Sequence, residues 1–257
     1  MGETMKKFLI LLSMLFCFTA YAQTETLNWY MDGQTYATTT CESGNDILLP
    51  TTPTKRGYTF KGWAEYIPIE YLESTGTQYI DTGYKPNDNT RMKITYIFTG
   101  TYGNIFGTRN SVNNAAFSIA YPPSQNALLL DYGSERDESV TKAPWSNTLI
   151  AVDFNKNILY MDNLSTGITY TKTFTIQTFH ANYNQILFGF NNLGIIAPAL
   201  AIIYSCKLYD NDVLVRDFIP VLDGNGTPCM YDKVTKQFFY NQGTGQFIAG
   251  PIIGSGE

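Results

Sequence analysis

Residues 150–162 read IAVDFNKNILYMD, and residues 205–218 read SCKLYDNDVLVRDF. In each stretch, apolar and polar side chains alternate on both sides of a short turn, at residues 155–157 and 210–212. Alternation with a period of two is typical of a strand with one buried face, and Asn and Asp favour tight turns. Each stretch therefore predicts a β-hairpin.

Similar strand-like stretches recur at short intervals over residues 71–250, separated by turn residues. They span residues 78–82, 91–98, 103–108, 115–120, 127–131, 149–154, 158–162, 169–174, 185–189, 200–209, 213–220, 228–232 and 237–240. The chain contains 19 Tyr and 16 Phe and is only 15% charged, a composition that favours strands over helices. We therefore predict an all-β protein whose large unit is a two-sheet antiparallel jelly-roll sandwich.

The first 22 residues have the three-part pattern of a secretory signal peptide. Lys6 and Lys7 precede an apolar run over residues 8–18, and a small-x-small cleavage site ends at Ala22. The apolar run is too short for a spanning helix, and no second long run follows. We expect export to the periplasm, the cell surface or the medium, with no membrane span after cleavage.

Residues 23–64 form a small first unit, with expected strands at 26–30 and 35–40. It ends in PTTPTKRGYTFKGW, residues 50–63. This phrase resembles the signature of the internalin-type Listeria–Bacteroides repeat in Pro50, Pro53, Lys55, Gly57, Tyr58, Phe60, Gly62 and Trp63. The resemblance implies a β-grasp-like module of exported bacterial surface proteins. Large side chains such as Tyr58, Phe60 and Trp63 suit a tiny core.

Residues 65–70 (EYIPIE) are predicted to form a linker, residues 71–250 the large unit, and residues 251–257 a tail. The stretch from residue 69 to 87, the hairpin at 150–162 and the closing run at 204–245 resemble a concanavalin-A-like, laminin-G-like jelly roll of exported bacterial proteins. That superfamily includes lectins, adhesion modules and glycoside hydrolases, so the resemblance does not decide function.

Three cysteines follow the export segment. Cys206 and Cys229 lie in one strand-rich segment, and an oxidising compartment favours a disulfide between them. The closing run of the jelly-roll resemblance supports this pairing. Cys41 is then left over, although a bridge from Cys41 to one of the others stays open as an alternative.

Charge excludes some partners. The chain carries 17 basic and 22 acidic residues and has no basic cluster, so nucleic acid and anionic membrane are not expected to bind.

No catalytic signature is present. The acidic stretch at residues 135–138 lacks the Glu-x-Asp-x-Glu spacing that places three carboxylates on one strand face, because Glu138 would face away from Glu135 and Asp137. We expect the stretch to be a solvated loop. The single histidine, His180, has no nucleophile motif or set of metal ligands to work with.

The sequence offers candidate residues for binding a glycan or calcium. A glycan site needs an exposed aromatic ring, and Trp145, Tyr102, Tyr121 and Tyr132 are the candidates because each flanks an expected loop. No cofactor is expected, apart from calcium, for which Asp81 and Asp88 near loops are candidate ligands.

The sequence thus favours an exported binding or adhesion protein that recognises a glycan or protein partner on a cell surface or envelope. A structural envelope protein without a small-ligand site is the alternative. A carbohydrate-active enzyme is a third interpretation, which requires paired carboxylates in a cleft.

Overall fold

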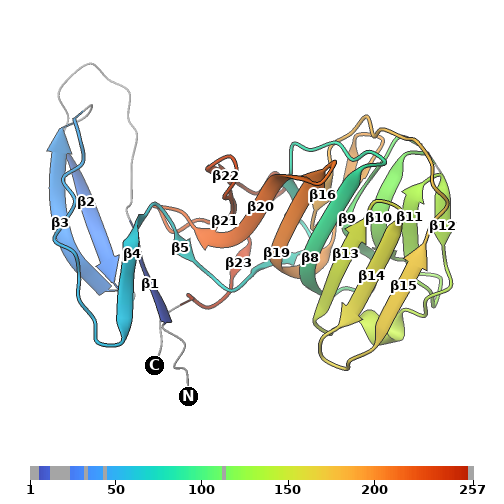
Figure 1. The fold of residues 1–257 in the computed structure, drawn as a ribbon, viewed down its shortest axis with the longest axis horizontal. Coiled ribbons are helices and arrows are strands. Elements are labelled where there is room, and N and C mark those ends of the chain that lie inside the picture. Colours follow the sequence, from blue (N-terminus) through green and yellow to red (C-terminus); the bar gives the residue numbers. More distant parts are fainter. Residues whose placement is uncertain (1–5, 12–23, 32–33, 43–44, 112–113, 254–257) are drawn as a thin grey trace.

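The computed structural model consists almost entirely of β-strands (Figure 1). It describes residues 6–11, 24–31, 34–42, 45–111 and 114–253. The predicted cleavage site at Ala22 and most of the predicted signal peptide lie outside these residues. The all-β class is confirmed, because helix in the described residues is confined to one 3-10 turn, η1 (Ala143–Trp145).

The larger sheet of the sandwich runs in the order β15-β14-β13-β8-β19-β20-β21-β22, and each pair of neighbours is antiparallel. The bounds are β8 (Thr90–Phe98), β13 (Ile150–Asn155), β14 (Ile158–Asn163), β15 (Thr169–Thr173), β19 (Leu200–Asp210), β20 (Val213–Leu222), β21 (Pro228–Asp232) and β22 (Gln237–Phe239). Three short strands join its margin: β5 (Ile67–Pro68), β6 (Leu72–Thr75) and β23 (Ile248–Ala249).

The second sheet runs in the order β12-β11-β10-β9-β16-β7, with the hairpin β17-β18 added through a parallel pairing of β17 with β9. The bounds are β7 (Ile80–Asp81), β9 (Gly103–Arg109), β10 (Ala116–Tyr121), β11 (Leu129–Gly133), β12 (Glu135–Asp137), β16 (Ile186–Leu187), β17 (Gly189–Asn192) and β18 (Ile195–Pro198). The two-sheet sandwich that the strand spacing predicted is therefore confirmed.

Alternating side chains build the core between the two sheets. In β8, Met92, Ile94 and Tyr96 are almost wholly buried, whereas Lys93 between them is exposed. A period of two places such residues on opposite faces of a strand. The outer face of the larger sheet is therefore polar over much of its width.

The first unit lies to one side of the sandwich in Figure 1. It contains the antiparallel hairpin of β2 (Thr24–Met31) and β3 (Gln34–Glu42), which confirms the two predicted strands. β4 (Tyr58–Ala64) pairs in parallel with β1 (Lys6–Leu11), a segment inside the predicted signal peptide. Cleavage at the predicted site would remove β1 from the mature chain.

The predicted linker, residues 65–70, is hydrogen-bonded to the larger sheet. β5 pairs with β20, the Ile69 amide donates to the Pro220 carbonyl at 3.1 Å, and the Ile69 side chain is 1% exposed. Ile253, in the predicted tail, donates its amide to the Pro68 carbonyl at 2.9 Å. These contacts fix the direction in which the chain leaves the first unit.

Candidate functional site

Three of the four aromatic residues predicted to bind a glycan lie in the core. Trp145 is 2% exposed, Tyr132 1% and Tyr121 0%. The Tyr121 hydroxyl donates to the Trp145 carbonyl at 2.9 Å, and the Tyr132 hydroxyl donates to the Asp88 carbonyl at 3.1 Å. The expectation that these rings face solvent is wrong. β10 and β11 direct Tyr121 and Tyr132 into the core, and the 3-10 turn η1 places Trp145 in the same core. Tyr102 is 63% exposed and does not join the other three.

The two candidate calcium ligands do not form a metal centre in the structure. The Asp81 carboxylate accepts hydrogen bonds from the Gly83 amide at 2.8 Å and the Asn184 side chain at 3.2 Å. The Asp88 amide donates a hydrogen bond to the Phe179 carbonyl, and the Asp88 carbonyl accepts one from the Tyr132 hydroxyl. Across the part of the chain that the structure describes, no three metal-ligating side chains gather. The structure thus gives calcium at Asp81 and Asp88 no support.

The predicted disulfide between Cys206 and Cys229 is not formed, and both thiols are free and buried. Cys206 on β19 lies opposite Phe218 of β20, whereas Cys229 on β21 lies opposite Val221. Phe218 and Val221 are an odd number of residues apart and so face opposite sides of the sheet. β20 also lies between the two cysteine strands, so the cysteines are two strand spacings, about 10 Å, apart, whereas a disulfide joins Cα atoms no more than about 7 Å apart. Cys41 on β3 is free as well.

The acidic stretch at residues 135–138 contains the edge strand β12 instead of the expected loop. Lys172 lies 3.4 Å from the Glu135 carboxylate and 3.6 Å from that of Asp137. Arg136 points elsewhere and binds Asp131 at 2.7 Å. Both carboxylates of β12 therefore have a cationic partner that links the edges of the two sheets.

A cleft with aromatic walls lies where the first unit meets the sandwich. Its volume is about 480 Å³. We call it the junction cleft, and the lining residues are Trp29, Ile47, Leu49, Trp63, Glu65, Tyr66, Tyr231 and Lys236. β2 and β4 supply the tryptophans, the segment between β4 and β5 supplies Glu65 and Tyr66, and β21 and the turn after it supply Tyr231 and Lys236.

The tryptophan wall is held rigidly. Trp29 is 0% exposed, and its indole Nε1 donates to the Thr39 hydroxyl at 2.8 Å. The Trp63 ring meets the Trp29 ring edge to face, with centroids 4.6 Å apart, and Phe60 packs on Trp63 at 5.3 Å. Phe60 and Trp63 thus pack on each other in the first unit, although both are partly exposed, while the side chain of Tyr58 lies outside the described set. Trp63 remains partly exposed toward the cleft.

The tyrosine wall crosses the junction. The Tyr66 and Tyr231 rings lie 4.4 Å apart between centroids, so the segment after β4 packs on the outer face of β21. Burial, followed by the neighbouring Glu65 carboxylate, raises the pKa of both phenols above their usual value. The Tyr231 hydroxyl is hydrogen-bonded to Glu65 and Tyr231 is 5% exposed, so Tyr66 is the phenol of this wall that a ligand can reach.

Charged and aliphatic side chains surround the cleft. Glu65 and Lys236 are exposed, and Leu49 is 58% exposed. Glu65 is the one carboxylate among the described residues that line the cleft. The lining is thus suited to binding: aromatic faces for a ring and hydrogen-bonding groups beside them.

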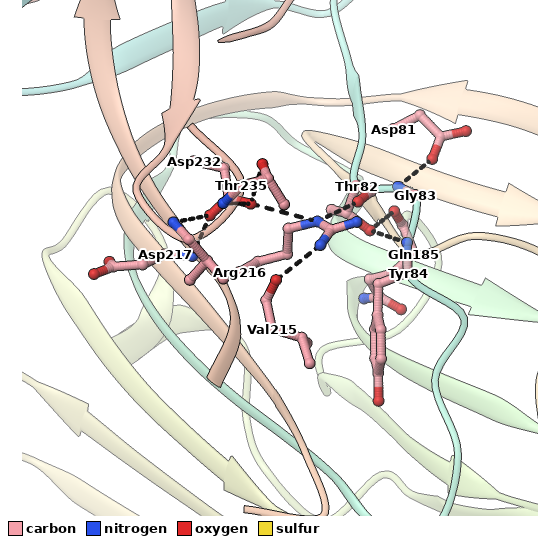
Figure 2. Close-up of polar contacts among 11 residues, drawn as sticks. Asp81, Thr82, Gly83, Tyr84, Gln185, Val215, Arg216, Asp217, Asp232 and Thr235 are labelled. Atoms are coloured by element: carbon pink, nitrogen blue, oxygen red, sulfur yellow. Dashed lines mark hydrogen bonds and ion pairs between the residues drawn. The ribbon is translucent and has the colours of Figure 1, made fainter. Parts of the chain in front are cut away.

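A buried polar network behind β21 positions the cleft wall (Figure 2). Asp232, 0% exposed, accepts hydrogen bonds from the amides of Asp217 at 2.8 Å and Val234 at 3.1 Å and from the Thr235 hydroxyl at 2.8 Å. The Arg216 guanidinium lies 3.8 Å from this carboxylate. Asp232 thereby shapes the turn at 233–236, which carries the cleft residue Lys236.

Arg216 also ties β20 to the connection after β7. Its Nε donates to the Thr82 carbonyl at 3.0 Å and its Nη1 to the Val215 carbonyl at 2.8 Å, as Figure 2 shows. The network therefore joins both sheets of the sandwich to the strand that forms the tyrosine wall.

Residues 26–93 match the family model of the Listeria-Bacteroides repeat domain. The match covers less than half of the chain and extends beyond the predicted boundary at Ala64, through β5 and β6 into β8. Six of the eight cleft residues belong to this repeat segment, and Tyr231 and Lys236 come from outside it.

Among solved structures, the chain is similar to mouse laminin alpha1 chain, domains LG4-5. The identity is 13% and the TM-score 0.37, over 74% of this chain and 66% of the laminin chain. No curated protein matches the chain. The described residues contain no helix with the length and hydrophobicity that a membrane crossing requires.

Sequence reasoning missed Tyr66 and Tyr231. Tyr66 lies in the predicted linker, and Tyr231 lies inside a predicted strand, where we expected no binding residue. The repeat signature did indicate Trp63, although as a core residue and not as a cleft wall.

Proposed function

We propose that the protein is an exported binding protein that recognises a glycan in the junction cleft, without catalysing a reaction on it. The observation that carries this proposal is the cleft itself, in which aromatic rings from the repeat segment and from β21 face one space of about 480 Å³. The match to a Listeria-Bacteroides repeat, a domain typical of extracellular or surface proteins, supports export. The predicted signal peptide agrees with it.

The chemistry of the lining favours a sugar. The Trp63 ring offers a flat apolar face, and the partly exposed Tyr66 offers a hydroxyl donor, whereas the Tyr231 hydroxyl is hydrogen-bonded to Glu65. The exposed Glu65 carboxylate accepts hydrogen bonds from sugar hydroxyls, and Lys236 donates to ring or carbonyl oxygens. A sugar ring has both an apolar face and a polar rim, and so matches this arrangement.

The test is a glycan array with the secreted protein and two variants. Tyr66→Ala removes one ring of the tyrosine wall. Tyr102→Ala removes a tyrosine that is 63% exposed and does not line the cleft. We expect the wild type and Tyr102→Ala to bind the same glycans and Tyr66→Ala to lose them. Circular dichroism establishes that both variants are folded. Absence of glycan binding by the folded wild type would overturn the proposal and favour a structural role in the envelope.

A further inference from the structure

A second hollow, of about 330 Å³, lies on the outer face of the larger sheet. We call it the sheet groove, and the lining residues are Lys93, Ile94, Thr95, Ala151, Val152, Asp153, Tyr160, Asp162, Ser205 and Lys207. It shares no lining residue with the junction cleft. The two hollows are thus separate features of the molecule.

Small side chains form the floor of the sheet groove. Thr95 of β8 lies opposite Ala151 of β13 on one side and opposite Ser205 of β19 on the other. Directly opposed residues point to the same face of a sheet. Three short side chains in one row therefore leave space between the longer side chains of the adjacent row.

That adjacent row places two lysines side by side. Tyr160 lies opposite Asp153, Asp153 opposite Lys93, and Lys93 opposite Lys207. Like charges directly opposite each other on neighbouring strands destabilise a sheet. The Lys93–Lys207 pair thus concentrates positive charge beside the floor of the groove.

The aspartate next to Lys93 already has a closer cation. Asp153 lies 2.6 Å from the Arg91 guanidinium but 3.4 Å from the Lys93 amine. Burial raises the pKa of the Asp153 carboxyl, but hydrogen bonds and charge from Arg91 and Lys93 outweigh it, and the pKa lies below its usual value.

The aspartate next to Lys207 also has a closer cation. Asp217 lies 3.0 Å from the Lys233 amine but 3.5 Å from the Lys207 amine. Each aspartate thus has two cationic neighbours. In both cases the groove lysine, Lys93 or Lys207, is farther from the carboxylate than the other cation. The side chains of these two lysines are 45% and 41% exposed, so both amines are open to a ligand from solvent.

We propose that the sheet groove binds an acidic polysaccharide with about one carboxylate per sugar ring. The carboxylate sits between Lys93 and Lys207, and a ring stacks on Tyr160, which is 43% exposed. The hydroxyls of Thr95 and Ser205 on the floor bind sugar hydroxyls. The exposed Asp162, opposite Ala151, borders the groove and disfavours a sugar ring that carries a second anionic group.

The test uses a short oligogalacturonate, with its methyl ester as a ligand of the same ring but without charge. Binding to the full exported chain is measured by isothermal titration calorimetry at low salt. The double variant Lys93→Ala, Lys207→Ala is compared with Lys85→Ala, which removes an exposed lysine that does not line the groove. Because both groove lysines are exposed, the double variant is expected to fold, and a thermal melt checks this.

We expect the double variant to bind at least about tenfold more weakly, because each lysine donates a charged hydrogen bond to the ligand. Lys85→Ala and the cleft variant Tyr66→Ala are expected to bind as the wild type does, which separates this site from the junction cleft. Tyr160→Ala is expected to weaken binding as well, and the methyl ester is expected not to bind.

Several results would overturn the assignment. One is undiminished binding by the folded double variant, and another is equal binding of the ester. The third is an equal loss in Lys85→Ala, or tighter binding of dextran sulfate than of oligogalacturonate, which would show general attraction of polyanions. Absence of binding by the wild type would also overturn it.

Discussion

Asp232→Ala is expected to be among the most destabilising single substitutions in the sandwich. The Asp232 side chain is fully buried and accepts hydrogen bonds from the amides of Asp217 and Val234 and from the hydroxyl of Thr235. It is also the carboxylate that lies 3.8 Å from Arg216. Alanine leaves the buried Asp217 amide and the Arg216 guanidinium without this carboxylate, whereas Val234 and Thr235 are exposed and water can replace the acceptor there.

The magnitude follows from the number of groups left unpaired. A buried donor without a partner costs about 1–3 kcal/mol, and removal of one partner of a buried ion pair costs about 3–5 kcal/mol. Arg216 keeps its hydrogen bonds to Thr82 and Val215, and its side chain is 20% exposed, which reduces the second contribution. We therefore expect a loss of about 4 kcal/mol, a large part of the roughly 5–15 kcal/mol of a typical domain.

Equilibrium unfolding in urea measures this loss. Asp162→Ala, which removes an exposed carboxylate from β14, is the matched control and is expected to change the free energy of unfolding by less than about 0.5 kcal/mol. Asp232→Asn keeps one acceptor oxygen and is expected to fall between the two. If Asp232→Ala and Asp162→Ala unfold at the same urea concentration with the same slope, the reasoning about the buried network is refuted.

Folding lowers the pKa of the Asp153 carboxyl below its ordinary 3.8, so its stabilisation is complete above pH 3.8 and is lost as the pH falls through the lower, folded value. The difference in unfolding free energy between wild type and Asp153→Asn should therefore shrink on acidification below pH 3.8, and a difference that grows there would contradict this. Burial raises the pKa of the Cys206 and Cys229 thiols, so alkylation of the native protein should label Cys41 alone, with no label added by prior reduction. Mass spectrometry that shows two further labels only after reduction would establish a disulfide. Trp145→Ala should cost about 3–5 kcal/mol in a urea titration but leave glycan binding by the folded fraction intact, and the reverse outcome would restore Trp145 as a binding residue.

The strands that sequence analysis predicted well have strong local alternation. Both ends of β13, β14 and β20 lie within two residues of their predicted bounds, and β21 matches residues 228–232. The strands that it missed are short and depend on distant partners. β6 exists because it pairs with β19 and β23, and β12 is a charged edge strand with no apolar alternation.

The error over the disulfide has two physical causes. The first is that β20 lies between the two cysteine strands, which alone puts the thiols out of disulfide reach, and the second is a difference in register. A bulge between Leu208 and Tyr209 shifts the register of β19 on β20 by one residue. Without that extra residue, Cys206 would lie opposite Asp217, on the same face of the sheet as Val221 and hence as Cys229. A shift of one residue moves a side chain to the other face, and the sequence contains no clear sign of it.

The candidate site was predictable only in part. The repeat signature drew attention to Trp63, but the cleft needs Tyr66 and Tyr231, which are far apart in sequence and meet only because β5 pairs with β20. The loop-flanking aromatics Tyr121 and Tyr132 were misassigned because each occupies a core-facing position near the end of a strand. Burial at strand ends depends on the opposite sheet and not on neighbouring residues.

Glycan recognition in the junction cleft is tested most directly by calorimetric titration of the strongest array ligand into wild type, Tyr66→Ala and Tyr102→Ala. Loss of the Tyr66 ring is expected to raise Kd about tenfold or more, because both a stacking face and a hydroxyl donor are removed. Tyr102→Ala is expected to keep the wild-type Kd. The same Kd for all three folded proteins would contradict binding in the cleft.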